Sequence, residues 1–160
     1  MSRVITFSRY FPNYHPRKGQ STLFVEKIWA SIGKPDQSII DEFIWPQGWL
    51  NQNFDPKHHT IRAGHRWKVG DKFSPRVWSG KPYNSKQIII APDIEIKKVW
   101  DFDIREDGSY RIDKTVFGLR GIREIAQNDG FADSDDFKLW FSPYKNFKGQ
   151  IISWNDKIDY

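Results

Sequence analysis

The sequence predicts one α+β domain over residues 1–160, a small mixed β-barrel with helices packed around it. A chain of 160 residues with eight Trp and twelve Phe is long and apolar enough to bury a single core. Segments rich in β-branched and aromatic residues, punctuated by Gly, Pro and Asp, open the chain and dominate its middle and end. Helical patterns separate them, without the alternating strand–helix order or the Gly-rich phosphate loop of a nucleotide-binding α/β fold.

The N-terminal third is predicted to contain one strand and two helices. Residues 4–11, VITFSRYF, are typical of a strand. Ser21 is placed to cap a helix with an apolar face that stops before Gly33. A second, short helix over residues 39–45 ends before Pro46, because proline cannot continue a helix.

The remainder is predicted to be mainly β. Short strand-like segments separated by turns occupy 59–64, 72–80, 86–92, 94–106, 109–113 and 147–155. Two helices come before the last strand: one begins near residue 119 and ends near Gly130, and the other follows a cap at Ser134.

Cysteine usage and hydropathy narrow the class of protein. The chain has no Cys, which excludes disulfides, thiolate chemistry and Cys-ligated metal sites. No segment approaches eighteen consecutive apolar residues, and the N-terminus lacks a signal-peptide pattern. We therefore expect a cytoplasmic protein with no membrane contact, while its oligomeric state stays open.

Positive charge is concentrated in the middle of the chain. Residues 57–98 carry ten Lys/Arg against three Asp/Glu, whereas residues 1–56 carry six against five and residues 99–160 carry nine against twelve. A basic region of this kind favours a phosphate-bearing partner, RNA or a nucleotide. The solvated surface of a mildly basic protein would give the same count.

The basic region begins with KHHTIRAGHRWKVGD, which gathers proton-transfer groups. On a strand, Thr60 and Arg62 point to the same face. Lys57 is in the loop leading in, so its stem can fold over Thr60, and a desolvated Lys can take the proton of a Thr hydroxyl. His58 is an alternative base, and it lies on the Thr60 side if the strand already includes residue 58. A strand Thr and a solvated Lys without any chemistry would have the same spacing.

The same stretch offers groups for binding. The planar fork of Arg62 suits a phosphate or a carbonyl oxygen. Arg66 and Lys68 are candidates for a phosphate-contacting rim, or are ordinary surface. His58 and His59 face opposite ways on a strand, and no H-x-H or H-x-x-x-H spacing occurs, so we predict neither a metal site nor a cofactor.

The run Lys57-His58-His59-Thr60-Ile61-Arg62, followed by Val69-Gly70-Asp71, resembles the signature of the ASCH domain family in the PUA superfamily, K-x-x-T-I-R and then G-D. The similarity extends to residues 4–7, to 126–131, where the family shows A-x-x-E-G-F, to 135–141 and to 149–154. It implies a PUA-like β-barrel whose cleft binds RNA or a modified nucleotide. Residues 20–56 look like a helical insertion.

Some small bacterial members of that family resemble 4-acetylcytidine amidohydrolases that use a Lys, a Thr and a Glu. Lys57 and Thr60 match the first two, and the Glu falls on Asp129. Asp is one methylene shorter, so its carboxylate would sit back by up to about 1.5 Å. Misplacement on the order of 1 Å can cost about a hundredfold in rate.

Three functions follow from these residues. In the first, Thr60 is the nucleophile, Lys57 its base and Asp129 the carboxylate that orients the Lys, and the protein hydrolyses an acyl amide on a cytidine-type base. In the second, Lys57 and Arg62 meet phosphate and Asp129 accepts a base amino group, so the cleft recognises nucleic acid without chemistry. In the third, His58 or Lys57 supports ribonuclease activity.

Overall fold

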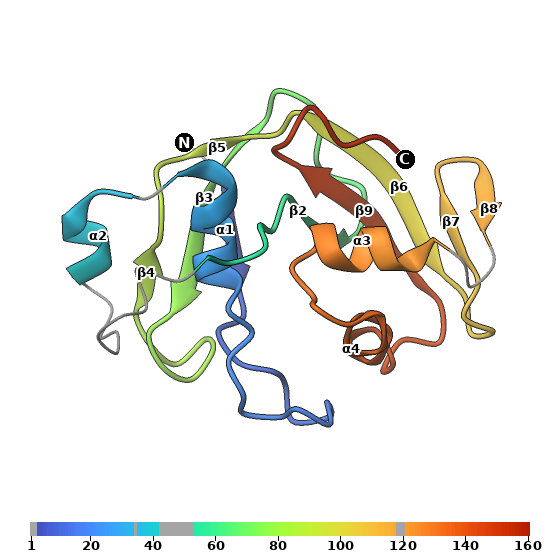
Figure 1. Cartoon of the computed structure of the whole chain (residues 1–160), viewed down its shortest axis with the longest axis horizontal. Coiled ribbons are helices and arrows are strands. Elements are labelled where there is room, and N and C mark those ends of the chain that lie inside the picture. Colours follow the sequence, from blue (N-terminus) through green and yellow to red (C-terminus); the bar gives the residue numbers. More distant parts are fainter. Residues whose placement is uncertain (1–2, 34, 42–52, 118–120) are drawn as a thin grey trace.

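The computed structural model describes residues 3–33, 35–41, 53–117 and 121–160, and these form two β-sheets and four helices (Figure 1). The predicted α+β class is confirmed. The strands are β1 (Arg3–Phe7), β2 (His59–Ala63), β3 (Lys72–Trp78), β4 (Gln87–Ile89), β5 (Ile94–Glu95), β6 (Lys98–Ile104), β7 (Tyr110–Ile112), β8 (Thr115–Phe117) and β9 (Phe147–Ser153). The helices are α1 (Phe24–Ile32), α2 (Gln37–Asp41), α3 (Ile122–Asn128) and α4 (Ser134–Trp140).

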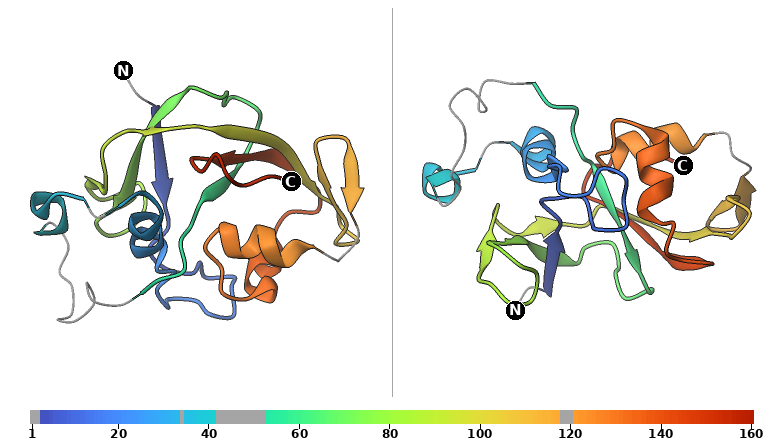
Figure 2. Two further views of the ribbon diagram at one scale, coloured as in Figure 1. Left: turned by 45° about the horizontal axis from the view of Figure 1, so that its top comes forward. Right: turned by 90° about the horizontal axis from the view of Figure 1, so that it is seen from below.

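The strands do not close into the expected barrel. One sheet has the order β1-β3-β4, with β5 also paired to β3, and the other has the order β2-β9-β6-β7-β8. Each sheet keeps its own edge strands in the part of the chain described, so the ladder is not continuous around a ring. Among the described elements the chain changes sheet three times, from β1 to β2, from β2 to β3 and from β5 to β6 (Figure 2). Between β1 of the first sheet and β2 of the second, a side chain makes the contact: Arg62 Nη2 on β2 donates a hydrogen bond to the Thr6 carbonyl on β1 at 2.8 Å.

The buried side chains form two hydrophobic clusters, and the five-stranded sheet contributes to both, with Ile152 of β9 in the first and Ile151 in the second. Val25, Ile28 and Trp29 of α1 pack with the side chains of the β1-β3-β4 sheet, and Trp29 Nε1 donates to the Ile90 carbonyl at 2.7 Å. Helices α3 and α4 cover the five-stranded sheet and bury Phe137 completely. Helix α1, within the predicted insertion, is therefore part of the core.

The N-terminal ends of α1 and α4 differ from the expected caps. Asp133, not Ser134, caps α4, and its carboxylate accepts from the Asp135 N–H. At α1 the residue in the cap position is Leu23, with φ +60°, and Ser21 bonds the Leu23 N–H one step earlier. The short helix begins at Gln37, and the predicted stretch beyond residue 41 lies outside the described residues.

None of the helices in the described segments is long and apolar enough to cross a membrane.

Candidate functional site

The segment that leads into β2 crosses between α1 and α3 (Figures 1 and 2). Backbone hydrogen bonds fix it on both sides: the Lys57 N–H donates to the Lys27 carbonyl in α1 at 2.9 Å, and the His58 N–H donates to the Asn128 carbonyl at 2.7 Å. Carbonyls in the last turn of a helix have no partner within the helix, and Asn128 O finds one here. Lys57 is thereby held at the junction of the two hydrophobic clusters.

The end of α3 is a Schellman turn. The Phe131 N–H donates to the Ala126 carbonyl at 2.9 Å, and the Gly130 N–H donates to the Gln127 carbonyl at 3.0 Å. Gly130 has φ +93°, which a residue with a Cβ adopts only with strain. The A-x-x-[acid]-G-F pattern of the sequence is thus a chain-reversal motif that brings an acidic side chain back toward β2.

Two lysine amines cap the carbonyls that follow Asn128. Lys57 Nζ donates to the Asp129 carbonyl, and Lys27 Nζ donates to the Gly130 carbonyl at 2.7 Å. Because the C-terminal end of a helix carries partial negative charge, it favours cations in this position. Lys57 therefore has a structural role in the fold as well as any role in chemistry.

Lys57 and Asp129 form a buried ion pair. Lys57 Nζ donates to Asp129 Oδ1 at 2.9 Å, and the two side chains are 2% and 6% exposed. Nζ also lies 4.4 Å from the centroid of the Phe24 ring. Desolvation lowers the pKa of Lys57 to about 8, against the opposing effect of Asp129, which raises it. An amine with this pKa is available as a base under mildly alkaline conditions.

Thr60 and Arg62 share a face of β2, as predicted. Arg62 Nε donates to Thr60 Oγ1 at 3.2 Å, and its Cζ lies 5.1 Å from the centroid of the Phe7 ring. Desolvation lowers the pKa of Arg62 to about 10, so the guanidinium stays charged at neutral pH. Arg62 thus directs a positively charged N–H group at the Thr60 hydroxyl oxygen, the atom predicted to act as nucleophile.

One cavity of about 60 Å³ brings the three predicted catalytic residues, Lys57, Thr60 and Asp129, together. Its wall is largely aromatic, with contributions from Phe7, Phe24, Phe131, Trp140 and Phe141. Lys57 and Thr60 both border it, yet the hydrogen bonds found for Lys57 Nζ in the described structure go to Asp129 and not to Thr60. A volume of this size holds about two water molecules, at roughly 30 Å³ each.

His58 is not at this cavity, so the prediction that it shares the Thr60 side is wrong. β2 begins only at His59, and His58 Nδ1 instead lies 2.9 Å from Ser31 Oγ and 3.1 Å from Asn155 Nδ2. It lines a separate polar cavity of about 290 Å³. The orientation of residue 58 is set by the bonds to α1 and α3, which strand alternation does not describe.

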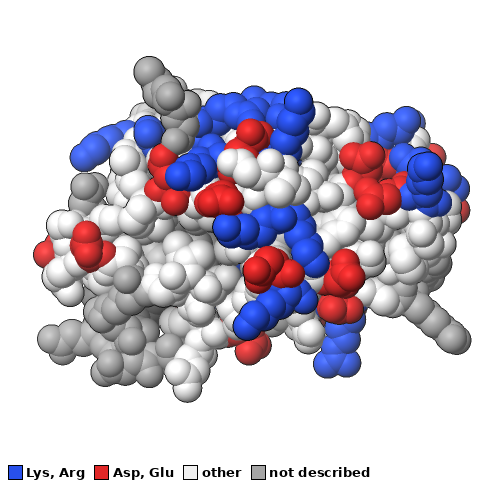
Figure 3. Space-filling view, turned by 90° about the horizontal axis from the view of Figure 1, so that it is seen from above, with Lys and Arg blue, Asp and Glu red and all other residues white. Residues whose placement is uncertain are grey.

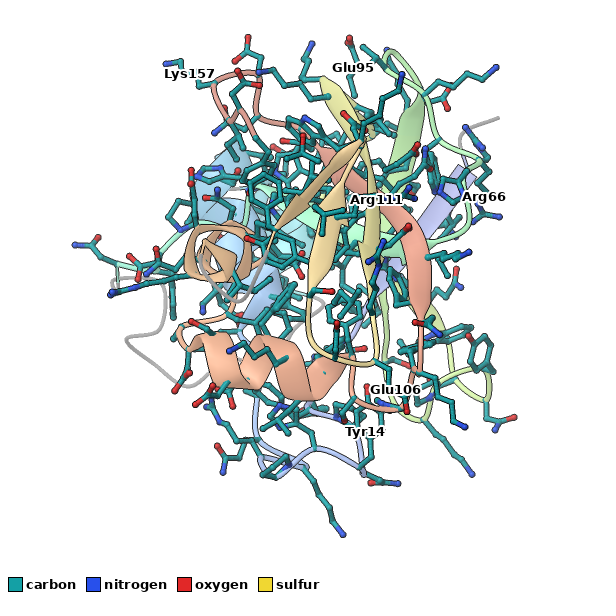
Figure 4. The ribbon with its side chains drawn as sticks, turned by 90° about the vertical axis from the view of Figure 1, so that its right-hand side faces the viewer. Tyr14, Arg66, Glu95, Glu106, Arg111 and Lys157 are labelled. Carbon is teal, nitrogen blue, oxygen red and sulfur yellow. The ribbon has the colours of Figure 1, made fainter. Side chains whose placement is uncertain are left out.

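Arg66 and Lys68 lie in the loop after β2 and border neither of these cavities. Both are exposed, and Figure 4 shows Arg66 at the periphery, on the side away from α3 and α4. Its guanidinium lies 5.3 Å from the ring of Trp67, a core residue. If Arg66 and Lys68 contact phosphate as predicted, they do so on the outer surface and not in either cavity.

The basic middle segment does not form an unbroken positive stripe on the face seen from above. Figure 3 shows Asp and Glu among the Lys and Arg side chains there. Ion pairs account for part of the mixing: Arg3 pairs with Asp71, and Lys97 Nζ lies 3.1 Å from Glu95 Oε1.

Sequence reasoning missed His59 and Tyr160. His59 is fully buried, its Nε2 lies 2.7 Å from the Tyr160 hydroxyl, and its Nδ1 lies 3.4 Å from Asp129 Oδ1. Asn128 Nδ2 donates to the same hydroxyl at 2.9 Å. No sequence pattern links residues 59, 128 and 160; the only hint was a His placed directly before the candidate Thr60.

The described residues contain no group of three or more His, Asp or Glu side chains arranged to hold a metal ion. Comparison with protein-family models, with curated proteins and with solved structures finds no match for this chain.

Proposed function

We propose that the protein is an ASCH-like, PUA-like nucleotide- or RNA-binding protein that hydrolyses an acyl amide on a cytidine-type base. The observation that carries the proposal is the buried amine of Lys57, held by Asp129 beside the cavity that Thr60 also borders. The residues of the K-x-x-T-I-R motif and the acidic residue before Gly130 are about seventy positions apart in sequence, yet they surround one cavity.

The proposed reaction assigns one role to each group. Neutral Lys57 takes the hydroxyl proton of Thr60, and the Thr60 oxygen attacks the acyl carbonyl carbon. The C–N bond then breaks, and the Lys57 ammonium returns its proton to the departing amino nitrogen of the base. Water, deprotonated in turn by Lys57, attacks the acyl carbon of the ester on Thr60. The bond between that carbon and the Thr60 oxygen breaks, Lys57 returns the proton to the Thr60 oxygen, and a carboxylic acid is released.

The charged neighbours support this sequence of steps. The Arg62 N–H directed at Thr60 Oγ1 stabilises the developing alkoxide. Asp129 holds the Lys57 amine in place through its side chain and its carbonyl, which limits the loss of position expected for an Asp where the family has Glu. With a pKa of about 8, roughly one Lys57 in ten is neutral at pH 7.

The size of the cavity sets a further requirement. An apolar cavity of about 150 Å³ binds benzene in another protein, and the volume of about 60 Å³ found here is much smaller. The acyl group alone must therefore enter beside Thr60, or a half-buried wall residue such as Trp140 must turn aside to admit the base. The proposal takes the base to stack against the aromatic wall.

The test is hydrolysis of 4-acetylcytidine by wild type, Thr60→Val and Lys57→Met, with binding of single-stranded RNA measured in parallel. Thr22→Val and Lys98→Met are matched controls, because both side chains are hydrogen-bonded but neither lines the cavity. We expect turnover in wild type and both controls and its loss in the two site variants. If wild type shows no turnover but binds RNA in a salt-sensitive way, the protein is a recognition module and not an enzyme.

A further inference from the structure

His59 is the least explained polar group near the candidate site. It is completely buried. Among the buried side-chain nitrogen and oxygen atoms of the described residues, His59 Nδ1 is the one that has no hydrogen-bond partner. Nδ1 lies 3.4 Å from Asp129 Oδ1, outside good hydrogen-bond geometry. Native proteins seldom leave a buried polar atom in this state unless it has another use.

The neighbours of His59 fix which ring nitrogen carries the proton. Asn128 Nδ2 donates to the Tyr160 hydroxyl oxygen at 2.9 Å, and that oxygen lies 2.7 Å from His59 Nε2. The single hydroxyl hydrogen finds no acceptor other than Nε2 in the described structure. Nε2 therefore accepts, and the proton of the neutral ring is on Nδ1. Desolvation also lowers the pKa of His59, which keeps the ring neutral near pH 7.

This tautomer directs an N–H group at the oxygen that binds Lys57. Asp129 Oδ1 accepts a hydrogen bond from Lys57 Nζ at 2.9 Å, and His59 Nδ1 lies 3.4 Å from the same oxygen. While Lys57 is an ammonium ion, it holds the carboxylate. Once Lys57 becomes a neutral base, Asp129 loses its charged donor inside the core, where an unsatisfied carboxylate is costly.

We propose that His59 is a positioning residue for Asp129, held as the Nδ1–H tautomer by Tyr160 and Asn128, and that it donates to Asp129 when Lys57 gives up its proton. The inference rests on the proposed function for its use in catalysis, since it describes the state in which Lys57 acts as base. In the proposed site Thr60 is the nucleophile, Lys57 its base and Asp129 the group that orients the base. His59 would be a fourth member, which orients Asp129.

The charges around Lys57 determine the sign of the effect. Asp129 faces it from the end of α3, Arg62 and His59 from β2, and Lys27 from α1. Removing the His59 donor destabilises the neutral-Lys57 state more than the charged state, because only the neutral state needs the second donor. The Lys57 pKa should therefore rise above its value of about 8 when the donor is lost.

The experiment is NMR on the ligand-free protein. Long-range ¹H–¹⁵N correlation reports the tautomer of His59, and ¹³C-labelled lysine reports the titration of Lys57. His59→Phe removes the donor, whereas His59→Asn keeps an N–H near the position of Nδ1, so it should rescue the effect. Tyr160→Phe removes the group that selects the tautomer, and Tyr144→Phe is an exposed control.

We expect Nδ1–H in wild type, a raised Lys57 pKa in His59→Phe, a near wild-type value in His59→Asn, and loss of the single tautomer in Tyr160→Phe but not in Tyr144→Phe. With 4-acetylcytidine, kcat of His59→Phe should fall about tenfold or more, as on removal of other orienting groups. An Nε2–H tautomer in wild type, or equal Lys57 pKa values in His59→Phe and His59→Asn, overturns the inference. If His59→Phe does not fold, the wild-type tautomer and Tyr160→Phe decide it. Because these spectra need no turnover, failure to hydrolyse 4-acetylcytidine would count against the proposed function alone.

Discussion

Gly130 packs directly against the lysine of the candidate site, so a single methyl group there should disturb both the turn and Lys57. A Cβ added at Gly130 would lie 3.2 Å from Lys57 Cδ, 3.3 Å from Lys57 Cβ and 3.2 Å from Phe24 Cδ1. The residue also has φ +93°, a conformation that costs a residue with a Cβ about 1–2 kcal/mol. Overpacking of this kind adds about 1–3 kcal/mol. Gly130→Ala should therefore lower the free energy of unfolding by about 2–5 kcal/mol.

Gly64 provides a matched control for the backbone part of this effect. It has φ +82°, and a Cβ there would meet nothing within 4 Å. Gly64→Ala should cost only the backbone contribution of about 1–2 kcal/mol. Urea denaturation followed by Trp fluorescence measures both variants. Equal losses of stability in the two would refute the claim that Gly130 is packed tightly against Lys57.

Three further predictions test the electrostatics of the site. The Lys57 pKa is about 8 in the folded protein and 10.5 ordinarily, so between pH 8 and pH 10.5 the unfolded chain binds more protons and the stability from this group rises with pH. The free energy of unfolding of wild type minus that of Lys57→Met should therefore grow by about 3 kcal/mol across that range. A difference that does not change with pH would contradict the burial of the amine. Asp129→Asn removes the group that raises the Lys57 pKa, so ¹³C NMR should find the pKa below 8, and an increase would be inconsistent with the ion pair. Arg62→Met should cost about 1.5–3 kcal/mol in thermal or urea unfolding, because it loses a charged hydrogen bond to Thr6 in the other sheet and one to Thr60 within β2. Lys97→Met, which loses an exposed ion pair with Glu95, should cost about 0–1 kcal/mol, and similar losses in the two variants would argue against a bridging role for Arg62.

Local sequence chemistry predicted those features that depend on only a few residues. Gly130 was expected at the end of a helix, and it forms a Schellman turn because only glycine adopts its φ without strain. Alternation along a strand placed Thr60 and Arg62 on one face, and their side chains are hydrogen-bonded at 3.2 Å. These results need no knowledge of the rest of the chain.

Features that depend on distant contacts were not predictable in this way. The direction of His58 follows from the backbone bonds that Lys57 and His58 make to α1 and α3, not from strand alternation, because β2 begins only at His59. The division into two sheets depends on which edges pair, and short strands with similar composition do not specify that. The contact of His59 with Tyr160 joins residues 101 positions apart, so no local pattern could have found it.

The most direct test of the proposed reaction is the pH dependence of kcat/KM for 4-acetylcytidine, measured on wild type and on Thr60→Val. If Lys57 is the base that activates Thr60, kcat/KM should rise with pH to a plateau with an apparent pKa near the Lys57 value of about 8, and Thr60→Val should be inactive at every pH. Turnover that survives in Thr60→Val, or no wild-type turnover at any pH, would contradict the assignment of Lys57 and Thr60 as base and nucleophile.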